Sequence, residues 1–283
     1  MELQPIFEQC RLSVDHYHSV AGGDINEAFC LYTKQGKFFF KFNSAALYPR
    51  MFEMEAAGLE TLAKTAFLKV PTVVALGEAS EHQFLLMEWL EKGVMSPGFW
   101  KSFGHGLAEL HQQTGSYFGW HSDNFIGSLR QINTPSSTWA AFYGEWRLIP
   151  LAKRLYDTGA FSNDDIRLLE QVCKNLSLLF PEERPALLHG DLWSGNFMIE
   201  QSGVPAIFDP AVYFGHREMD LGMTRLFGGF DPLFYEAYNE RFPLEKGWEK
   251  RVTLTQLYPL LVHAILFGGN YVESARQVIK NFA

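Results

Sequence analysis

The sequence predicts a bilobal α+β fold, with a small β-rich N-terminal lobe and a larger, mainly helical C-terminal lobe. Short β-prone runs with turn signals dominate the residues before Leu90, and periodic apolar positions typical of helices dominate those after it. The stretch 189–209 departs from both patterns, because it places polar side chains on either side of a short apolar run. We therefore divide the chain into lobes at 1–90 and 91–283, with the boundary close to 89–93.

The N-terminal lobe is expected to contain a hairpin, a helix and two further strands. Four β-prone runs predict the strands: 28–32, 37–42, 73–76 and 83–87. Between the first two runs, Lys34-Gln35-Gly36 is typical of a hairpin turn. The stretch 49–64 has a helical period instead, because Met51, Glu55 and Leu59 recur on one face.

The C-terminal lobe is expected to consist mainly of helices. Apolar positions with helical period predict them near 97–113, 136–157, 163–180, 218–227, 231–240 and 250–280. A compact β-region is expected around 189–209. No internal repeat, low-complexity tract or long linker interrupts this pattern.

Composition argues against several classes of partner. The formal net charge is −8 and no run is rich in Lys and Arg, which disfavours nucleic acid or an anionic membrane as the main partner. The longest apolar segment, 257–267, is too short to span a membrane and contains Pro259 and His263. The N-terminus lacks the pattern of a signal peptide. Three cysteines without paired spacing indicate reduced thiols, so we expect a cytoplasmic protein.

The most informative residues are Asp191, Asn196 and Asp209. The first two are five positions apart, and Asp209 follows thirteen positions later, at the end of the apolar run 204–208. In phosphoryl transfer, one carboxylate orients and deprotonates the attacking hydroxyl, while an amide and a second carboxylate hold Mg²⁺ at the phosphates. The spacing matches the catalytic loop of kinases. Gly190 stands where protein kinases carry an arginine, which favours a small-molecule acceptor.

A lysine and a glutamate in the N-terminal lobe fit the same chemistry. Lys41 lies in the apolar run 38–42, where a cation either faces solvent at a sheet edge or needs a buried anionic partner. Glu55 lies on the apolar face of the following helix, beside Met51 and Leu59. Together they predict the strand-lysine and helix-glutamate ion pair that positions nucleotide phosphates in kinases.

Two further segments are candidates for binding the nucleotide. Gly22 and Gly23 carry no Cβ, so the turn that leads to Asn26 could bring backbone amides close to phosphate oxygens, although such turns are commonly only structural. The strand end near Glu88 and Leu90 is interpreted as a hinge whose backbone groups bind adenine. The alternative there is a buried strand that leads into a turn.

Three other polar residues have two interpretations each. His189 is a catalytic base by type, but we favour a structural role in packing the loop against the core. Asp220 either complements the start of a helix or, in a kinase-like arrangement, anchors the backbone of the catalytic loop. Arg217 either forms a surface ion pair or contacts the substrate or a phosphate.

On these motifs the sequence resembles the fructosamine kinase (ketosamine 3-kinase) family. This family belongs to the aminoglycoside-phosphotransferase and choline-kinase-like group with a protein-kinase-like fold. The stretches that carry the resemblance are 124–128, 189–196 and 209–220, and it extends from the Gly-rich turn to the C-terminal helices. It implies ATP-dependent phosphorylation of the 3-hydroxyl of a ketosamine, the adduct of a sugar and an amine, as a deglycation repair step.

The resemblance also implies roles for individual residues. Asp191 would be the base, and Asn196 and Asp209 would bind Mg²⁺. Lys41 and Glu55 would form the pair that positions the phosphates of ATP.

Trp193 looks like a wall of the sugar site, because an aromatic face suits the apolar side of a sugar.

Two positions depart from related patterns. Many family members have a cysteine where Asp24 stands, so we expect no thiol switch in this turn. Pro210 follows Asp209 in place of the Phe-Gly of protein kinases, so the inactivating Phe flip is not expected.

Two other functions are compatible with the motifs. A kinase for an aminoglycoside or choline would need a strongly acidic site or an aromatic box. A nucleotide-binding pseudokinase would act by interaction alone, but the intact set of polar residues argues against it. The sequence carries no signal for the oligomeric state or for the choice among fructosyl, ribulosyl and erythrulosyl adducts, free or protein-bound.

Overall fold

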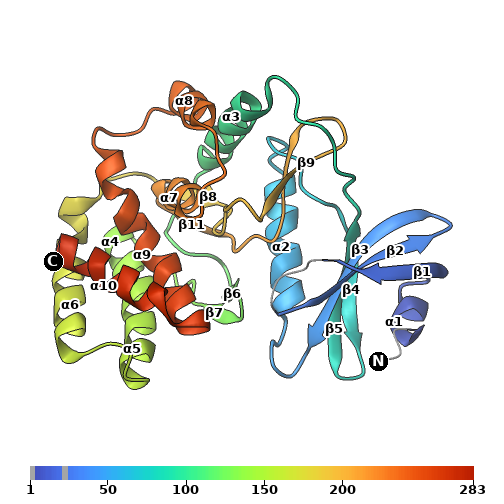
Figure 1. Ribbon diagram of the computed structural model, residues 1–283, viewed down its shortest axis with the longest axis horizontal. Helices are drawn as coiled ribbons and strands as arrows, with labels where there is room; N and C mark the ends of the chain where they lie inside the picture. The colour runs from blue at the N-terminus through green and yellow to red at the C-terminus, as the bar shows by residue number, and fades with distance from the viewer. Residues whose placement is uncertain (1–3, 21–24) are drawn as a thin grey trace. The chain divides into compact units, whose positions relative to one another are not determined.

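Strands dominate one part of the chain and helices dominate the other in the computed structural model, which describes residues 4–20 and 25–283 (Figure 1). The chain divides into two units. Unit 1 comprises the chain up to Phe99 together with Phe197–Pro210, and unit 2 comprises Trp100–Asn196 and Ala211–Ala283. The α and β content of both units agrees with the predicted α+β class.

Unit 1 is built on a five-stranded antiparallel sheet with the order β1-β2-β3-β5-β4. Its strands are β1 (Val14–Ser19), β2 (Glu27–Thr33), β3 (Gly36–Ser44), β4 (Val73–Ala79) and β5 (His82–Glu88). The four predicted strands and the hairpin turn between β2 and β3 are confirmed. Strand β1 was not predicted, because nearly all its side chains are exposed and show no alternation of apolar and polar residues.

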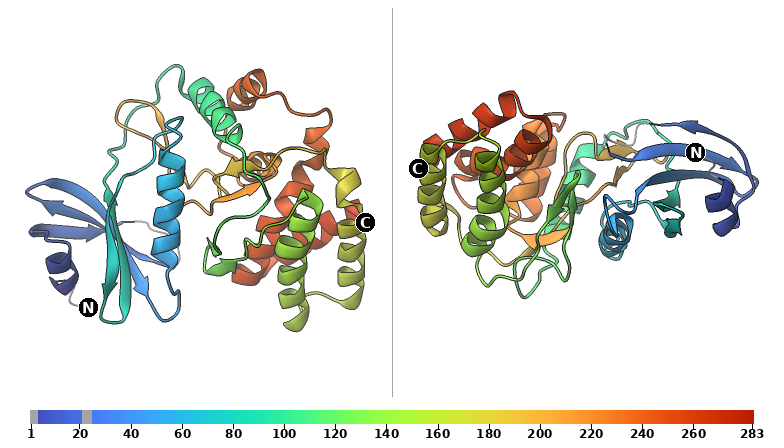
Figure 2. Two further views of the ribbon diagram at one scale, coloured as in Figure 1. Left: turned by 180° about the vertical axis from the view of Figure 1, so that it is seen from behind. Right: turned by 90° about the horizontal axis from the view of Figure 1, so that it is seen from below.

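Two helices cover parts of this sheet. The predicted helix is confirmed as α2 (Met51–Ala63). Helix α1 (Gln4–Gln9) was not predicted, because one turn and a half shows too little periodicity. It buries Ile6 and Phe7 against Phe40 and its neighbours in the sheet core, and Figure 2 shows it beside the sheet from two further directions.

A short hairpin from late in the sequence completes unit 1. It consists of β9 (Phe197–Ile199) and β10 (Pro205–Ile207). Ile207 donates its N–H to the Lys69 carbonyl (2.9 Å), and Gly93 donates its N–H to the Ile199 carbonyl (2.9 Å). These bonds place Asp209, which follows β10, in the same unit as the sheet.

Unit 2 is mainly helical. Its helices are α3 (Phe99–His111), α4 (Trp139–Phe142), the π-helix η1 (Tyr143–Leu148), α5 (Ile149–Asp157), α6 (Asn163–Leu179), α7 (Glu218–Leu226), α8 (Pro232–Arg241), α9 (Trp248–Phe267) and α10 (Asn270–Phe282). The predicted helical regions are confirmed, with two refinements. The π-helix interrupts the region 136–157, and Gly268 and Gly269, both with positive φ, divide the region 250–280 into two helices.

Two small strand pairs in unit 2 frame the polar loops. They are β6 (Asn124–Ile126) with β7 (Leu129–Gln131), and β8 (Ala186–Leu188) with β11 (Tyr213–Gly215). Strand β8 leads directly into the loop that contains Asp191. The predicted β-region around this loop is therefore present.

Candidate active site

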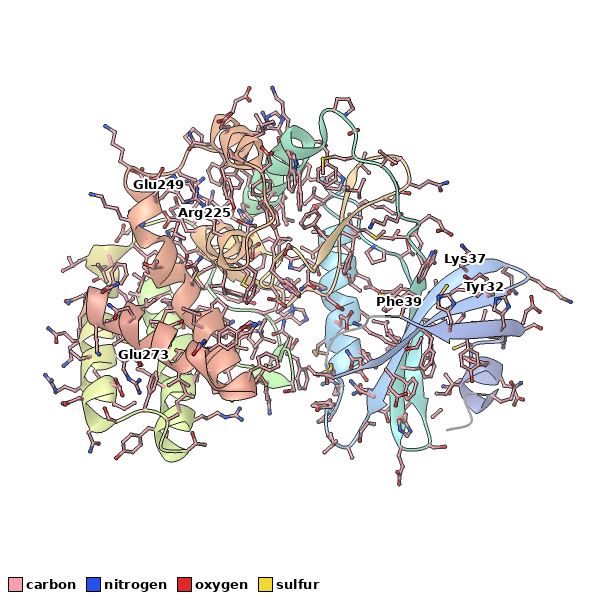
Figure 3. The ribbon with its side chains drawn as sticks, viewed as in Figure 1. Tyr32, Lys37, Phe39, Arg225, Glu249 and Glu273 are labelled. Carbon is pink, nitrogen blue, oxygen red and sulfur yellow. The ribbon has the colours of Figure 1, made fainter. Side chains whose placement is uncertain are left out.

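Two lysines on β3 have different surroundings. Lys37 lies near the hairpin turn, where its Nζ pairs with Glu91 (2.6 Å) and lies 5.5 Å from the centroid of the Tyr32 ring (Figure 3). Lys41 is only 1% exposed, and its Nζ lies 2.8 Å from Glu55 Oε1. The predicted ion pair between strand and helix is therefore present, and Lys41 is a buried cation rather than a solvated edge residue.

Asp209 joins this pair, which the sequence did not predict. Its Oδ1 lies 2.5 Å from Lys41 Nζ. Asp209 has a φ of 54°, a left-handed conformation that is costly for a residue other than glycine and is common at functional sites. One buried ammonium group thus contacts two carboxylates, those of Glu55 and Asp209.

The ionisation of this cluster follows from its burial. Burial, opposed by Lys41 and reinforced by Asp209, raises the pKa of Glu55 to a net value of about 7. Burial disfavours the charge on Lys41, but the two carboxylates outweigh it and raise the lysine pKa above its usual value. Lys41 therefore stays charged, whereas Glu55 takes up a proton readily near neutral pH. A cation that engaged Asp209 would leave Glu55 as the main partner of the lysine.

The predicted nucleotide residues elsewhere in unit 1 are described in part. Gly22, Gly23 and Asp24 lie outside the described residues. Asn26 is held by Asn43, whose Nδ2 donates to Asn26 Oδ1 (2.7 Å).

At the predicted hinge, the side chain of Glu88 already has hydrogen-bond partners within unit 1. Glu88 accepts two hydrogen bonds from Lys69 Nζ (2.7 and 2.9 Å) and one from Thr72 Oγ1 (3.1 Å). Burial disfavours its ionisation, but Lys69 and Thr72 outweigh this and lower the pKa of Glu88. Binding of adenine through the backbone of Glu88 and Leu90 stays a prediction.

In unit 2, the loop after β8 brings Asp191 and Asn196 together. Asn196 Nδ2 donates to the Asp191 carbonyl (2.9 Å) and to Asp191 Oδ2 (3.1 Å). Because both amide hydrogens point to Asp191, Oδ1 is the end of the amide that could reach a cation. The amide oxygen of Asn196 and the carboxylate of Asp209 are hard oxygen ligands of the kind that Mg²⁺ prefers. The residue types therefore fit the predicted metal.

Asp220 anchors the start of this loop, as the kinase-like interpretation predicted. Its carboxylate accepts hydrogen bonds from the N–H groups of His189 (2.8 Å) and Gly190 (2.9 Å). His111 Nε2 lies 3.1 Å from Asp220 Oδ2, a partner that sequence spacing could not indicate. Burial disfavours ionisation of Asp220, but His111 and the loop amides outweigh this and lower its pKa. His189 is fully buried and its Nδ1 accepts from Asp191 N–H, which supports the structural role.

Gly190 has a steric reason to be glycine. Its φ is +85°, and a Cβ at this position would overlap the carbonyl of Ala211. Ala211 donates its N–H to the His189 carbonyl (2.9 Å), so the two segments are closely apposed. This requirement is independent of the acceptor, and the preference for a small molecule needs other support.

Trp193 lies beside the loop as a partly exposed aromatic surface. It is 36% exposed, and its ring centroid lies 5.6 Å from that of Phe227 in an edge-to-face contact. A Cβ on Gly195 would overlap the Trp193 ring. The indole therefore lies over a glycine that must lack a side chain.

We expect Gly195→Ala to displace Trp193 without unfolding the protein, because the added methyl group would occupy the place of the indole. The change should lower kcat/KM for the acceptor by about tenfold, which corresponds to about 1.4 kcal/mol of binding energy in the transition state. Steady-state kinetics with varied acceptor would measure this effect. Gly98→Ala is a matched control, since a Cβ there meets no atom within 4 Å and the backbone does not have a positive φ. Unchanged acceptor kinetics in Gly195→Ala would show that the position of Trp193 is unimportant.

Arg217 is a buried structural residue, so the predicted contact with substrate is not supported. Its guanidinium forms a bidentate pair with Glu183 (Nη2 to Oε1, 2.7 Å) and donates to the carbonyls of Phe242 (2.8 Å) and Pro243 (2.7 Å). It also stacks on the Phe242 ring at 3.7 Å. These contacts occupy the donors that a substrate would need. The ion-pair interpretation is the correct one, although the pair is buried rather than on the surface.

The neighbouring His216 should make stability depend on pH. It is fully buried, and burial lowers its pKa below the ordinary 6.5. Below this pH the unfolded chain binds a proton that the native ring does not, so the free energy of unfolding should fall as the pH drops below 6.5. His216→Asn keeps a short acceptor for the N–H of Glu218 and removes this titration. Urea unfolding between pH 5 and 7.5 should show a weaker loss of stability in the variant, and parallel curves would contradict the prediction.

The fold and these residues together define a class of protein. The chain has the fold of kinase-like phosphotransferases. An aminoglycoside phosphotransferase solved as a ternary complex with AMP-PNP and hygromycin B aligns with 100% of this chain and 99% of its own, at a TM-score of 0.64 and 16% identity. The predicted bilobal, protein-kinase-like fold class is thereby confirmed.

The family follows from closer relatives. The profile of the fructosamine kinase family matches residues 6–283, and the chain belongs to this family of kinases. A probable ketoamine kinase of Synechocystis is 41% identical over 94% of this chain and 90% of its own length. A chloroplastic protein-ribulosamine 3-kinase of Arabidopsis thaliana is 41% identical over 93% and 81%. A Thermobifida fusca protein described as a "putative fructosamine-3-kinase" has a TM-score of 0.89 at 35% identity, over 99% of this chain and 97% of its own.

No helix in the described part of the chain combines the length and the apolar character needed to cross a membrane.

Proposed function

We propose that this kinase transfers the γ-phosphoryl group of ATP to the 3-hydroxyl of a ketosamine. The observation that carries the proposal is the pairing of Asn196 with Asp191 on a loop anchored by Asp220, in a chain that belongs to the fructosamine kinase family. The carboxylate of Asp191 would accept the proton of the attacking hydroxyl. Its hydrogen bond from Asn196 keeps the base and the neighbouring amide in one fixed arrangement.

Unit 1 would supply the nucleotide contacts. Lys41, held by Glu55, carries a positive charge at a defined position and would contact the phosphates of ATP. Asn196 and Asp209 would hold Mg²⁺, which neutralises phosphate charge when it is bound. Backbone groups of the Gly22–Gly23 turn and of the hinge at Glu88 would complete the nucleotide contacts. The division into a nucleotide lobe at 1–90 and a catalytic lobe at 91–283 is part of this proposal.

Trp193 and Phe227 would form one side of the acceptor site. An indole that lies beside the base and is partly exposed can pack on the apolar side of a sugar chain. Ribulosamines are the first acceptors to test, because the Arabidopsis relative is named as a protein-ribulosamine 3-kinase. Phosphorylation at the 3-position makes the adduct unstable, so the biological outcome would be deglycation of free or protein-bound amines.

The cellular location is proposed to be a reducing compartment, the cytoplasm. Three cysteines are present as free thiols: Cys10, Cys30 and Cys173. Burial raises the pKa of each of them. Such thiols are protonated and unreactive at neutral pH, which fits an enzyme without structural disulfides.

The experiment that tests the function compares acceptors under the same conditions. Ribulosyl-lysine, fructosyl-lysine and an aminoglycoside would each be incubated with ATP and Mg²⁺, and the phosphorylated product identified by mass spectrometry. We expect transfer to a ketosamine and none to the aminoglycoside. Faster phosphorylation of the aminoglycoside would favour that alternative, and no transfer to any acceptor would favour a nucleotide-binding pseudokinase.

A further inference from the structure

A chain of buried amides connects the β6–β7 hairpin to the catalytic loop. Asn124 Nδ2 donates to the Val212 carbonyl (2.8 Å), and Gln131 Nε2 donates to the Ala211 carbonyl (3.1 Å). Ala211 in turn donates its N–H to the carbonyl of His189, the first residue of the loop (2.9 Å). Two side chains from a distant part of the sequence therefore hold the segment against which the loop rests.

The opposite end of this chain is a fully buried cation, Arg147. Its Nη2 donates to Asn133 Oδ1 (2.6 Å), and its guanidinium lies over the rings of Phe142, Tyr213 and Tyr258, at 4.4, 4.5 and 5.3 Å from their centroids. It forms no ion pair with any carboxylate in residues 4–20 or 25–283. Burying such a charge is costly, so the ring faces and the amide and carbonyl oxygens must compensate it.

The local backbone explains how an arginine enters the core. Residues 143–148 form the π-helical turn η1, in which Tyr143, Gly144, Arg147 and Leu148 are buried. A π-helical turn changes the phase of the side chains relative to an α-helix, and such turns are frequent at functional sites. Here the turn directs the guanidinium towards Asn133.

The Arg147 cation fixes the direction of every hydrogen bond in this row of amide side chains. A guanidinium can only donate, so Asn133 must present Oδ1 to Arg147 and use Nδ2 to donate to Asn124 Oδ1 (2.9 Å). Asn124 therefore has only Nδ2 left for Val212, whose carbonyl can only accept. Gln131 likewise uses its Nε2 as the donor, because Asn124 Oδ1 and the Ala211 carbonyl can only accept.

The amide of Gln131 is oriented from both ends. Its Nε2 donates to Asn124 Oδ1 (2.8 Å) and to the Ala211 carbonyl, and its Oε1 accepts from Tyr258 Oη–H (2.8 Å). The Arg147 guanidinium, which can only donate, lies at one end of the network, and the carbonyls of Ala211 and Val212, which can only accept, lie at the other. Only one arrangement of the amide groups satisfies both ends.

We infer that this network, from Arg147 through Asn133, Asn124 and Gln131 to the carbonyls of Ala211 and Val212, positions the catalytic loop for phosphoryl transfer. Its members are positioning residues, because they act through Ala211 and His189 rather than on a substrate. The inference rests on the proposed function only for the identity of the reaction.

Tyr258 links the network to the base electrostatically. Burial, opposed by Arg147 and reinforced by the negative charge of Asp191, raises the pKa of Tyr258 to a net value of about 12. The phenol is therefore protonated and available as a donor to Gln131. It also lies close enough to Asp191 to sense its charge.

The decisive variant is Asn124→Asp, which keeps the size of the side chain and replaces the group that donates to Val212 with an acceptor. We expect kcat to fall by about 100-fold, because small displacements of a catalytic group can have effects of this order. The KM for ATP should stay within about twofold, since the proposed nucleotide contacts are in unit 1. Hydrogen exchange at the Ala211 amide should become faster, while the amides of the neighbouring β8–β11 pair serve as an internal reference.

Tyr258→Phe is a milder variant that decides the question if Asn124→Asp does not fold. It removes the donor to Gln131, and we expect kcat to fall by about tenfold, equivalent to one lost hydrogen bond. Tyr235→Phe is the matched control. It also removes a phenol hydroxyl, which bonds to Thr224 Oγ1 (3.0 Å) in unit 2 and is not part of the amide network. Its kcat should stay within about twofold of wild type.

Two results would overturn the inference. One is wild-type protection of the Ala211 amide, together with normal kcat, in whichever of the two network variants folds. The other is an equal fall of kcat in Tyr235→Phe and Tyr258→Phe, which would show a general effect of losing a hydrogen-bonded tyrosine hydroxyl. Absence of ketosamine kinase activity in the wild type would instead contradict the proposed function, and the exchange experiment would still test the network.

Discussion

Replacing Asp191 with asparagine should lower kcat by about a thousandfold, because the amide cannot accept the proton of the attacking hydroxyl. The substituted side chain can still accept a hydrogen bond from Asn196 Nδ2, so the loop should keep its conformation. The affinity for ATP should be nearly unchanged, since the proposed nucleotide contacts lie in unit 1. Turnover would be measured by product formation with the preferred ketosamine, and ATP affinity by calorimetry.

The control for this variant is Asp231→Asn, the same substitution at a helix cap in unit 2. Asp231 Oδ1 accepts from the Leu233 N–H (2.9 Å) at the start of α8, and asparagine is a comparable cap. Its turnover should equal that of wild type. If Asp191→Asn kept more than a tenth of wild-type turnover, Asp191 would not be the general base.

The parts of the fold that the sequence predicts are those with strong local periodicity. Strands β2 to β5 alternate or form apolar runs, and α2 and α6 repeat apolar residues at helical spacing. The parts that it misses depend on tertiary contacts. Helix α1 is stable because Ile6 and Phe7 pack on the sheet, and β1 because it pairs with β2. The π-helical turn at Arg147 has no local signal, since π-helices lack a sequence pattern of their own.

The same distinction applies to the candidate site. Asp191 and Asn196 are recognisable because one loop holds both, so their sequence spacing reflects their spatial relation. Lys41 and Glu55 are recognisable because each is a charged residue in an apolar pattern that requires a partner. The contact of Asp209 with Lys41 depends on the return of β9 and β10 to unit 1 through the Lys69 carbonyl.

The partners of Arg217 decide between its two interpretations. Arg217 and Lys41 are both cations near predicted motifs, and no sequence pattern distinguishes a ligand contact from an internal ion pair at Arg217. The structure separates them through their partners. Arg217 uses its donors on Glu183 and backbone carbonyls, whereas Lys41 faces Asp209, which is 39% exposed.

Replacing Lys41 with methionine should remove activity and also destabilise unit 1. The substitution leaves the carboxylates of Glu55 and Asp209 close together without their cation, and breaking a buried pair in this way costs about 3–5 kcal/mol. The loss of unfolding free energy should be greater at pH 8 than at pH 6. Because the pKa of Glu55 is about 7 even with the lysine present, protonation relieves the repulsion at the lower pH. Denaturant unfolding at the two pH values would measure this difference.

The double variant Lys41→Met/Glu55→Gln separates stability from function. It removes the charge of both partners, so most of the lost stability should return, whereas turnover should stay at least about 100-fold below wild type because no cation remains to contact the phosphates. Lys37→Met is the control on the same strand, where the pair with Glu91 is exposed, and should leave both stability and turnover nearly unchanged. If the double variant regained turnover along with stability, Lys41 would serve only the fold, and the positive charge at the phosphates would have to come from another residue.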